Sequence, residues 1–316
     1  MDFTYLRLLV AIISLFSITF LGVWFRKRNV MKSDADPSLH WLLINLFTPC
    51  LIIDAFLTNA EIISLKPLLT APILGFTTAI LGLIISGIFA RNIPSGESKR
   101  AFCVCTSFYN YGYLPIPIVL IFFNISLLKT LFLFNIGLDI ALWTLGFGIL
   151  TGKGNLSTSL RRIGNPPFYA ILFSLTITYL YKENPFPNSI SSVIHMSGQA
   201  AIPVALLALG GLIYDHRRLI RPQDNFKTLF SAVALRLLLI PLCFVGILYT
   251  VSLPAELKII LSIQTGMPSA ILPTVIISRY GGDFHLALRI LVTTSLFALF
   301  TTPAWLSFLL TYTQTS

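Results

Sequence analysis

The amino-acid sequence predicts an all-α integral membrane protein with ten transmembrane helices, arranged as two inverted repeats of five. Three observations support this fold class. First, 55% of the 316 residues are hydrophobic and only 11% are charged, which is too apolar for soluble domains of this length. Second, apolar windows of about 20 residues, the length that crosses a bilayer, recur from end to end. Third, the loops between these windows alternate between basic and nearly uncharged.

Each predicted span is a continuous apolar segment bounded by charged or turn-forming residues. The first segment is too long for a signal peptide and lacks a small-residue cleavage site, so it is predicted to remain as a membrane helix. No polar block is long enough to fold as a soluble domain, which makes residues 1–316 a single membrane unit. The predicted spans are 3–25, 38–57, 67–90, 101–123, 127–150, 166–181, 190–214, 226–251, 257–278 and 286–310.

The basic residues orient these spans. Loops after odd-numbered spans carry clusters such as Arg26, Lys27 and Arg28, whereas the opposite loops carry single lysines. Lys and Arg concentrate on the cytoplasmic side, so both termini are predicted on the non-cytoplasmic side of a bacterial-type plasma membrane. The net charge of +10 is accounted for by these short loops. No nucleic-acid partner is therefore expected.

An internal repeat is indicated at an offset of 154 residues. The pattern Asn45-x-x-x-Pro49 in the second span recurs as Gln199-x-x-x-Pro203 in the seventh. The same offset carries Asn110 onto Gln264 and Gly112 onto Gly266. Repeats at 1–152 and 160–316, of five spans each, would have opposite orientations in the membrane.

Prolines predict breaks in the fourth and ninth spans. Pro115 and Pro117 should interrupt the fourth span within 111–117, and Gly266, Pro268 and Pro273 should interrupt the ninth. Such breaks are tolerated only inside protein or beside a cavity, where half-helix N-termini attract anions. The alternative is that these prolines merely kink packed helices. The candidate binding residues are Asn110, Tyr111, Gly112, Pro115, Pro117, Gln264, Gly266, Met267 and Pro268, with Tyr113 in the apolar wall and Asn45 and Gln199 as contacts from the scaffold side.

Three ionisable residues lie inside apolar spans. Asp139 and Arg236 could form an ion pair or flank the site. Arg236 could be the counter-charge to an anion, and Asp139 or Asp54 could carry a coupling proton or sodium ion. Asp54 lies near a span end, where a solvated position is favoured, and the histidines are interpreted as solvated or helix-end residues. Cys103-x-Cys105 has no further ligand close in sequence, so neither a disulfide framework nor a metal site is expected.

Three motifs resemble the auxin efflux carrier family, which includes bacterial membrane transport proteins and the plant PIN-type exporters. They are NLFTPCLI at 45–52, NYGYLPIP at 110–117 and QTGMPSAILPTVIISRYGGD at 264–283. The resemblance implies a fold similar to bile-acid symporters and sodium/proton antiporters. It implies a dimerising scaffold of helices 1, 2, 6 and 7 and a moving transport domain of helices 3–5 and 8–10. It also implies a substrate site at Asn110, Pro115, Pro117 and 264–268.

This chain departs from the family in two places. Bacterial members often have Gly-x-Pro after the crossover asparagine, where this chain has Pro115-Ile116-Pro117. The long central cytoplasmic loop of many plant exporters is absent, so control by phosphorylation of such a loop is not indicated.

The function expected from these features is secondary transport of a small organic anion, such as an auxin-like carboxylate or a dicarboxylate, by elevator-type alternating access. The alternatives are a sodium- or proton-coupled symporter of a neutral or sterol-like solute and, beyond these, a channel or receptor. The chain shows no Ser/His, paired-Asp or HExxH arrangement, so enzymatic activity and cofactors are not expected. The expected partners are the anion, the lipid bilayer and a second copy of the chain.

Overall fold

The computed structural model describes residues 5–58, 65–93, 96–152, 163–217 and 226–315. These residues are helical and contain no β-strand apart from one isolated bridge. Seven helices in them are long and apolar enough to cross a membrane, at 5–27, 33–57, 66–92, 126–151, 188–215, 226–250 and 284–311. The protein is therefore a multi-pass membrane protein, as its composition predicts.

Two of the long helices contain a π-helical segment that ends two residues before a proline. The second span runs as α2 (Asp36–Leu42), the π-helix η2 (Leu43–Phe47) and α3 (Thr48–Leu57). The eighth runs as α13 (Phe226–Ala234), the π-helix η6 (Leu235–Leu239) and α14 (Ile240–Thr250). Pro49 and Pro241 lack an N–H and their rings crowd the preceding turn, and the wider π turn accommodates both effects.

The remaining long helices are α1 (Tyr5–Lys27), α4 (Leu65–Phe89), α7 (Ser126–Ala141), α12 (Ala201–Asp215) and α17 (Phe284–Thr315). The π-helix η4 (Leu142–Gly146) and α8 (Phe147–Thr151) continue α7, and α11 (Asn188–Gln199) precedes α12. The short 3-10 helices are η1 (Ser33–Ala35) and η3 (Ala90–Asn92).

Five helices are shorter. α10 (Pro166–Tyr181) has the predicted bounds, because Asn165 accepts a hydrogen bond from the Phe168 N–H at its start and Lys182 ends it in the left-handed conformation. The others are the interrupted pairs α5 (Gly96–Ser107) with α6 (Pro115–Phe122), and α15 (Ala255–Thr265) with α16 (Ile271–Tyr280).

Two helix pairs pack closely through glycines. A Cβ added at Gly22 of α1 would lie 2.3 Å from the Leu207 carbonyl oxygen of α12. In the same way, a Cβ at Gly137 of α7 would lie 1.9 Å from the Pro72 carbonyl oxygen of α4. Without a side chain at these positions the backbones touch, which is a common way for membrane helices to associate.

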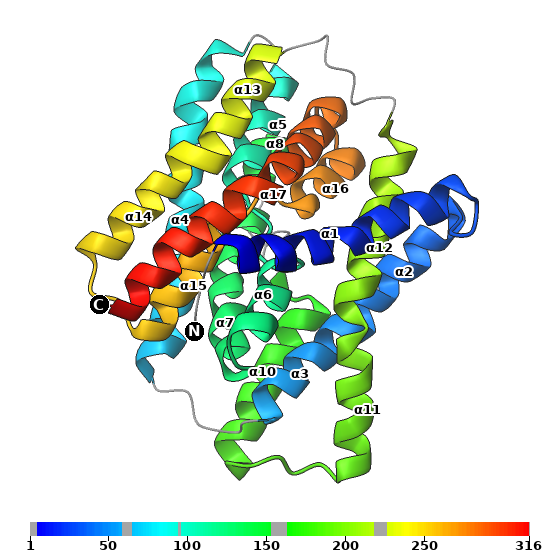
Figure 1. Ribbon diagram of the computed structural model, residues 1–316, viewed down its shortest axis with the longest axis vertical. Helices are drawn as coiled ribbons and strands as arrows, with labels where there is room; N and C mark the ends of the chain where they lie inside the picture. Colours follow the sequence, from blue (N-terminus) through cyan, green and yellow to red (C-terminus); the bar gives the residue numbers. More distant parts are fainter. Residues whose placement is uncertain (1–4, 59–64, 94–95, 153–162, 218–225, 316) are drawn as a thin grey trace.

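The helices gather in two groups in Figure 1. α1 packs against α12, and α3 packs against α10 and α11, on the right and lower part of the view. α4 packs against α7 and α5, while α17 packs against α5, α13 and α15, in the remainder of the molecule. Contacts of α1 with α17 and of α3 with α7 join the two groups.

Candidate functional site

The two interrupted helices meet at their breaks. The Asn110 N–H donates to the Pro268 carbonyl at 2.7 Å, and the Ala270 N–H donates to the Phe108 carbonyl at 2.9 Å. These bonds flank an antiparallel bridge between Tyr109 and Ser269. Backbone groups that leave a helix inside the bilayer cost several kcal/mol each when unpaired. The two broken segments therefore supply hydrogen-bond partners for each other's unwound backbone.

The break in the fourth span lies slightly before the interval that the prolines predicted. α5 ends at Ser107 and α6 begins at Pro115, with Pro117 in its first turn. N–H groups in the first turn of a helix have no helical acceptor, so prolines are tolerated there. The start of α6 is thus fixed by Pro115, and 108–114 is the unwound segment.

The antiparallel bridge pairs Tyr109 with Ser269, so Asn110 lies opposite Pro268. Gln264 accordingly does not face Asn110. It lies in the last turn of α15, fully buried, where its Nε2 donates to Asn135 Oδ1 at 3.4 Å.

A cavity of about 340 Å³ borders the crossing. Its wall is mostly apolar and comes from both helix groups. The crossing segments, α7 and the start of α16 contribute Asn110, Tyr111, Gly112, Tyr113, Asn135, Asp139, Ala270, Ile271 and Leu272. The helices α2, η2, α3 and α12 contribute His40, Leu43, Leu51, Ala205 and Leu209 among others.

Asn110 contributes an available amide to this cavity. Its residue is only 6% exposed, and its side-chain amide makes no hydrogen bond within the described part of the chain. The N-terminus of α16 borders the same cavity at Ile271 and Leu272, whose N–H groups have no acceptor in the described ranges. An amide and free N–H groups at a helix N-terminus are suited to binding a carboxylate.

A chain of hydrogen bonds joins the two interrupted helices through α7. The Tyr111 hydroxyl donates to Asp139 Oδ1 at 2.5 Å, and Asn135 Nδ2 donates to the Tyr111 carbonyl at 2.9 Å. Asn135 in turn accepts from Gln264. Sequence reasoning missed Asn135, although its position four residues before Asp139 places both on one face of α7.

Several predicted binding residues lie behind the cavity wall. Pro115, Pro117, Gln264, Gly266, Met267 and Pro268 are not part of the lining. Met267 is fully buried, and the Gly266 carbonyl accepts from the Thr302 hydroxyl at 2.5 Å. Of the nine candidates, Asn110, Tyr111 and Gly112 border the cavity, and the others shape the crossing.

Arg236 and Asp139 form no ion pair in the described structure. Arg236 is fully buried on η6, and its Nη1 lies 3.5 Å from the carbonyl of Ser107, the last residue of α5. Its guanidinium stacks on Tyr109, 4.7 Å from the ring centroid. A cation at a helix C-terminus offsets the partial negative charge there. Arg236 therefore stabilises the crossing from outside the cavity.

The scaffold-side candidates also lie away from the cavity. Asn45 is exposed and donates to the Trp41 carbonyl, and Gln199 contacts the His195 ring at 3.2 Å. His195 Nδ1 lies 2.9 Å from Asp54 Oδ2, and the Asp54 side chain is only 9% exposed. Asp54 is thus held by His195 and by the Thr58 hydroxyl, which corrects its interpretation as merely solvated, whereas His195 is 49% exposed.

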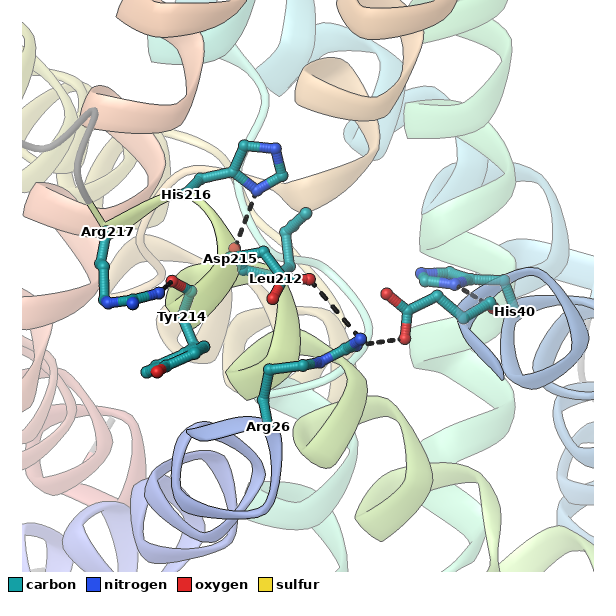
Figure 2. Close-up of polar contacts among 8 residues, drawn as sticks. Arg26, His40, Leu212, Tyr214, Asp215, His216 and Arg217 are labelled. Atoms are coloured by element: carbon teal, nitrogen blue, oxygen red, sulfur yellow. Dashed lines mark hydrogen bonds and ion pairs between the residues drawn. The ribbon is translucent and has the colours of Figure 1, made fainter. Parts of the chain in front are cut away.

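A charged cluster lies at one end of the cavity and joins three helices (Figure 2). Arg26 of α1 bonds to Asp36 of α2, and its Nη1 lies 3.6 Å from Asp215 Oδ2 of α12. His40 Nδ1 contacts the Asp36 carbonyl at 2.7 Å, and the His40 side chain borders the cavity. Arg26, expected only as an orienting loop charge, is 4% exposed and fixes these helix ends.

Comparison with known proteins supports a transport role. A family model described as "Membrane transport protein" matches residues 7–159 and 151–306. An uncharacterized transporter of Methanothermobacter thermautotrophicus is 25% identical over 301 residues, covering 93% of this chain and 96% of the relative. An uncharacterized transporter of Methanocaldococcus jannaschii is 21% identical over 313 residues, covering 96% and 97%. The chain belongs to the membrane transport protein family, the auxin efflux carrier family that its three motifs resemble.

Proposed function

We propose that the protein is a secondary transporter that binds a small organic anion in the cavity beside the helix crossing. The observation that carries this proposal is the free, buried amide of Asn110 in the same wall as the N-terminus of α16. These groups supply hydrogen bonds and a partial positive charge to a carboxylate, while the apolar remainder of the wall suits a hydrocarbon or aromatic body.

The proposal includes a membrane arrangement. Three further crossings are added to the seven long helices, which gives ten: the interrupted pair α5 and α6, the helix α10, and the interrupted pair α15 and α16. The two sets of five are inverted repeats, with both termini on the non-cytoplasmic side of the plasma membrane. This count is supported by the alternation of basic loops and by the antiparallel pairing of the two broken segments.

The transport movement that we propose is an elevator. Helices α1, α2, α3, α10, α11 and α12 form a static scaffold that pairs with a second copy, and the other helix group carries the substrate past it. The contacts within each group support this division, and the cavity has walls from both groups. A movement of one group along the other would expose the cavity to alternate sides.

A second candidate is ion-coupled transport of a neutral solute. Asp139 favours it, because a carboxylate in the cavity wall offers a site for a cation. Under this alternative Asn110 would bind an uncharged polar group, since an amide can donate as well as accept.

The test combines binding and transport. Purified protein is screened by thermal shift against mono- and dicarboxylates, and the best of them is used in counterflow with proteoliposomes. Asn110→Ala should weaken binding by about 10- to 100-fold, since a hydrogen bond to a charged group contributes about 1.5–3 kcal/mol. Asn188→Ala, at the exposed start of α11, is the matched control and should behave as wild type. Undiminished counterflow by Asn110→Ala would refute the site.

A further inference from the structure

We propose that Asp139 is a proton-binding site that couples one proton to each organic anion carried. This inference rests on the proposed function, because it concerns the same cavity. The inference names the coupling ion and the residue that binds it. One proton per anion balances the charge of a monocarboxylate and halves the net charge that a dicarboxylate brings.

The position of Asp139 is the first argument. It lies on α7 with its side chain in the cavity lining, between Asn135 one turn before it and Trp143 one turn after it. Oδ1 accepts from the Tyr111 hydroxyl at 2.5 Å. Oδ2 has no partner in the described part of the chain, and no arginine or lysine there forms a salt bridge with Asp139. One oxygen is thus held in place while the other is available to a proton.

The electrostatics of the cavity are the second argument. A substrate carboxylate at Asn110 and the start of α16 would share a largely apolar cavity with Asp139. Two carboxylates in one poorly solvated site repel each other strongly, and such pairs generally retain a proton. The Asp139 carboxylate therefore takes one proton from water when the anion enters, and it returns that proton when the anion leaves. Proton and anion binding must favour each other equally, since the coupling is reciprocal.

The surroundings of Asp139 contain few other titratable groups. Tyr111 and Tyr113 from the segment between α5 and α6, and His40 from α2, share the cavity lining. Asp54 of α3 is partnered by His195, and Glu256 of α15 accepts from Thr130 near the start of α7. α4 packs along α7 with Lys66 only at its N-terminal end. Asp139 is thus the described carboxylate that faces the substrate.

The ligands around Asp139 favour a proton over a metal cation. Hard cations take several oxygen ligands at once. The side-chain oxygens beside Asp139 in the cavity wall are the Tyr111 hydroxyl and the Asn135 amide oxygen, and the amide oxygen already accepts from Gln264. The described residues contain no cluster of three acidic, histidine or cysteine side chains that could hold a metal. A single carboxyl oxygen is sufficient for a proton.

The hydrogen-bond chain gives protonation a route to both broken helices. Asp139 is joined to Tyr111 of the first crossing segment, and through Asn135 to Gln264 at the end of α15. Protonation of Asp139 weakens its carboxyl group as acceptor of the hydrogen bond from the Tyr111 hydroxyl. The two crossing segments therefore respond together to the proton.

The test has a part that needs no substrate. Infrared difference spectra of the purified protein, recorded between acid and alkaline pH, should contain a protonated-carboxyl band that Asp139→Asn lacks. Asp54→Asn is the matched control, because it removes another buried membrane carboxylate outside the cavity, and it should retain the Asp139 band. A spectrum unchanged by Asp139→Asn would overturn the proposal.

The second part measures protons taken up with the anion. Phenylacetate and malonate are titrated into detergent-solubilised protein by calorimetry, in two buffers of different ionisation enthalpy at one pH. Wild type and Asp54→Asn should take up close to one proton per bound anion, and wild-type affinity should fall about tenfold per pH unit once Asp139 is ionised. Asp139→Asn should take up none, and its affinity should be independent of pH.

The outcomes separate the two proposals. Binding without proton uptake, or uptake that survives in Asp139→Asn, would overturn the assignment of Asp139 and leave the anion site standing. A requirement for sodium in place of the proton would overturn it too. If Asp139 titrates in the infrared spectra but neither acid binds, the proton site stands and the substrate class of the proposed function fails for both probes.

Discussion

Gly137 sets how closely α7 approaches α4, and its replacement by alanine is expected to destabilise the protein. A Cβ at this position would lie 1.9 Å from the Pro72 carbonyl oxygen and 2.6 Å from the Phe76 nitrogen. An ordinary contact needs about 3.2 Å, so the helices would have to separate by about 1.3 Å. Both obstacles are backbone atoms, which cannot rotate away.

The magnitude follows from two opposing terms. Overpacking against a rigid neighbour costs about 3 kcal/mol at the upper end of the usual range, and alanine gains about 1 kcal/mol over glycine in a helix. The expected net loss is about 2 kcal/mol. Gly246→Ala on α14 is the matched control, because nothing lies within 4 Å of its added Cβ. It should be neutral or more stable by up to about 1 kcal/mol.

The free energies of unfolding of wild type, Gly137→Ala and Gly246→Ala are compared by reversible unfolding in mixed micelles with increasing SDS. Gly137 lies on the face of α7 opposite Asn135 and Asp139, because two residues along a helix correspond to a rotation of about 200°. Displacing α7 from α4 should therefore also weaken anion binding. If Gly137→Ala and Gly246→Ala unfold at the same SDS fraction, the close contact of α4 and α7 is wrong.

Three further predictions concern buried charges. Arg236→Gln removes the cation at the end of α5 and should cost about 2 kcal/mol, whereas Arg236→Lys keeps the charge and should lose less; equal thermal midpoints for the two would contradict this role. His195→Ala removes one of two partners of the Asp54 carboxylate, which keeps the Thr58 hydroxyl, so the expected cost is about 0.5–1.5 kcal/mol. A double-mutant cycle with Asp54→Asn should reveal coupling between the two residues, and strict additivity would disprove it. Asp36→Asn should lower the thermal midpoint more than Asp215→Asn, because Arg26 donates a hydrogen bond to Asp36 but lies 3.6 Å from Asp215. The reverse order would argue against the cluster.

Much of the helical layout could be predicted from sequence because it depends on local properties. Apolar length identifies the seven helices that are long enough to cross a membrane. The bounds 166–181 coincide with α10, since Pro166 and the polar residues after Tyr181 are start and stop signals. The breaks were predicted within a few residues because a proline restricts its own turn wherever it occurs. Asn110 could be identified because an amide beside glycine and proline is unusual in an apolar span.

The arrangement of the site could not be predicted, because it depends on how separate helices are rotated and shifted against one another. A repeat offset relates equivalent residues of the two halves, but it does not say which residues face each other, so it cannot specify that Tyr109 pairs with Ser269. Composition cannot show that Met267 lies behind the wall while Asn135 lies in it, because both are intramembrane residues with similar local surroundings.

The sequence by itself determined that this is a multi-pass membrane protein of a transport family, with two proline-interrupted helices and three intramembrane charges. Only the tertiary structure decided the partner of each charge: the end of α5 for Arg236, His195 for Asp54, and the cavity with Tyr111 for Asp139. The physical reason is that a buried charge is stabilised by groups within a few ångströms in space, and those groups come from helices far apart in the chain.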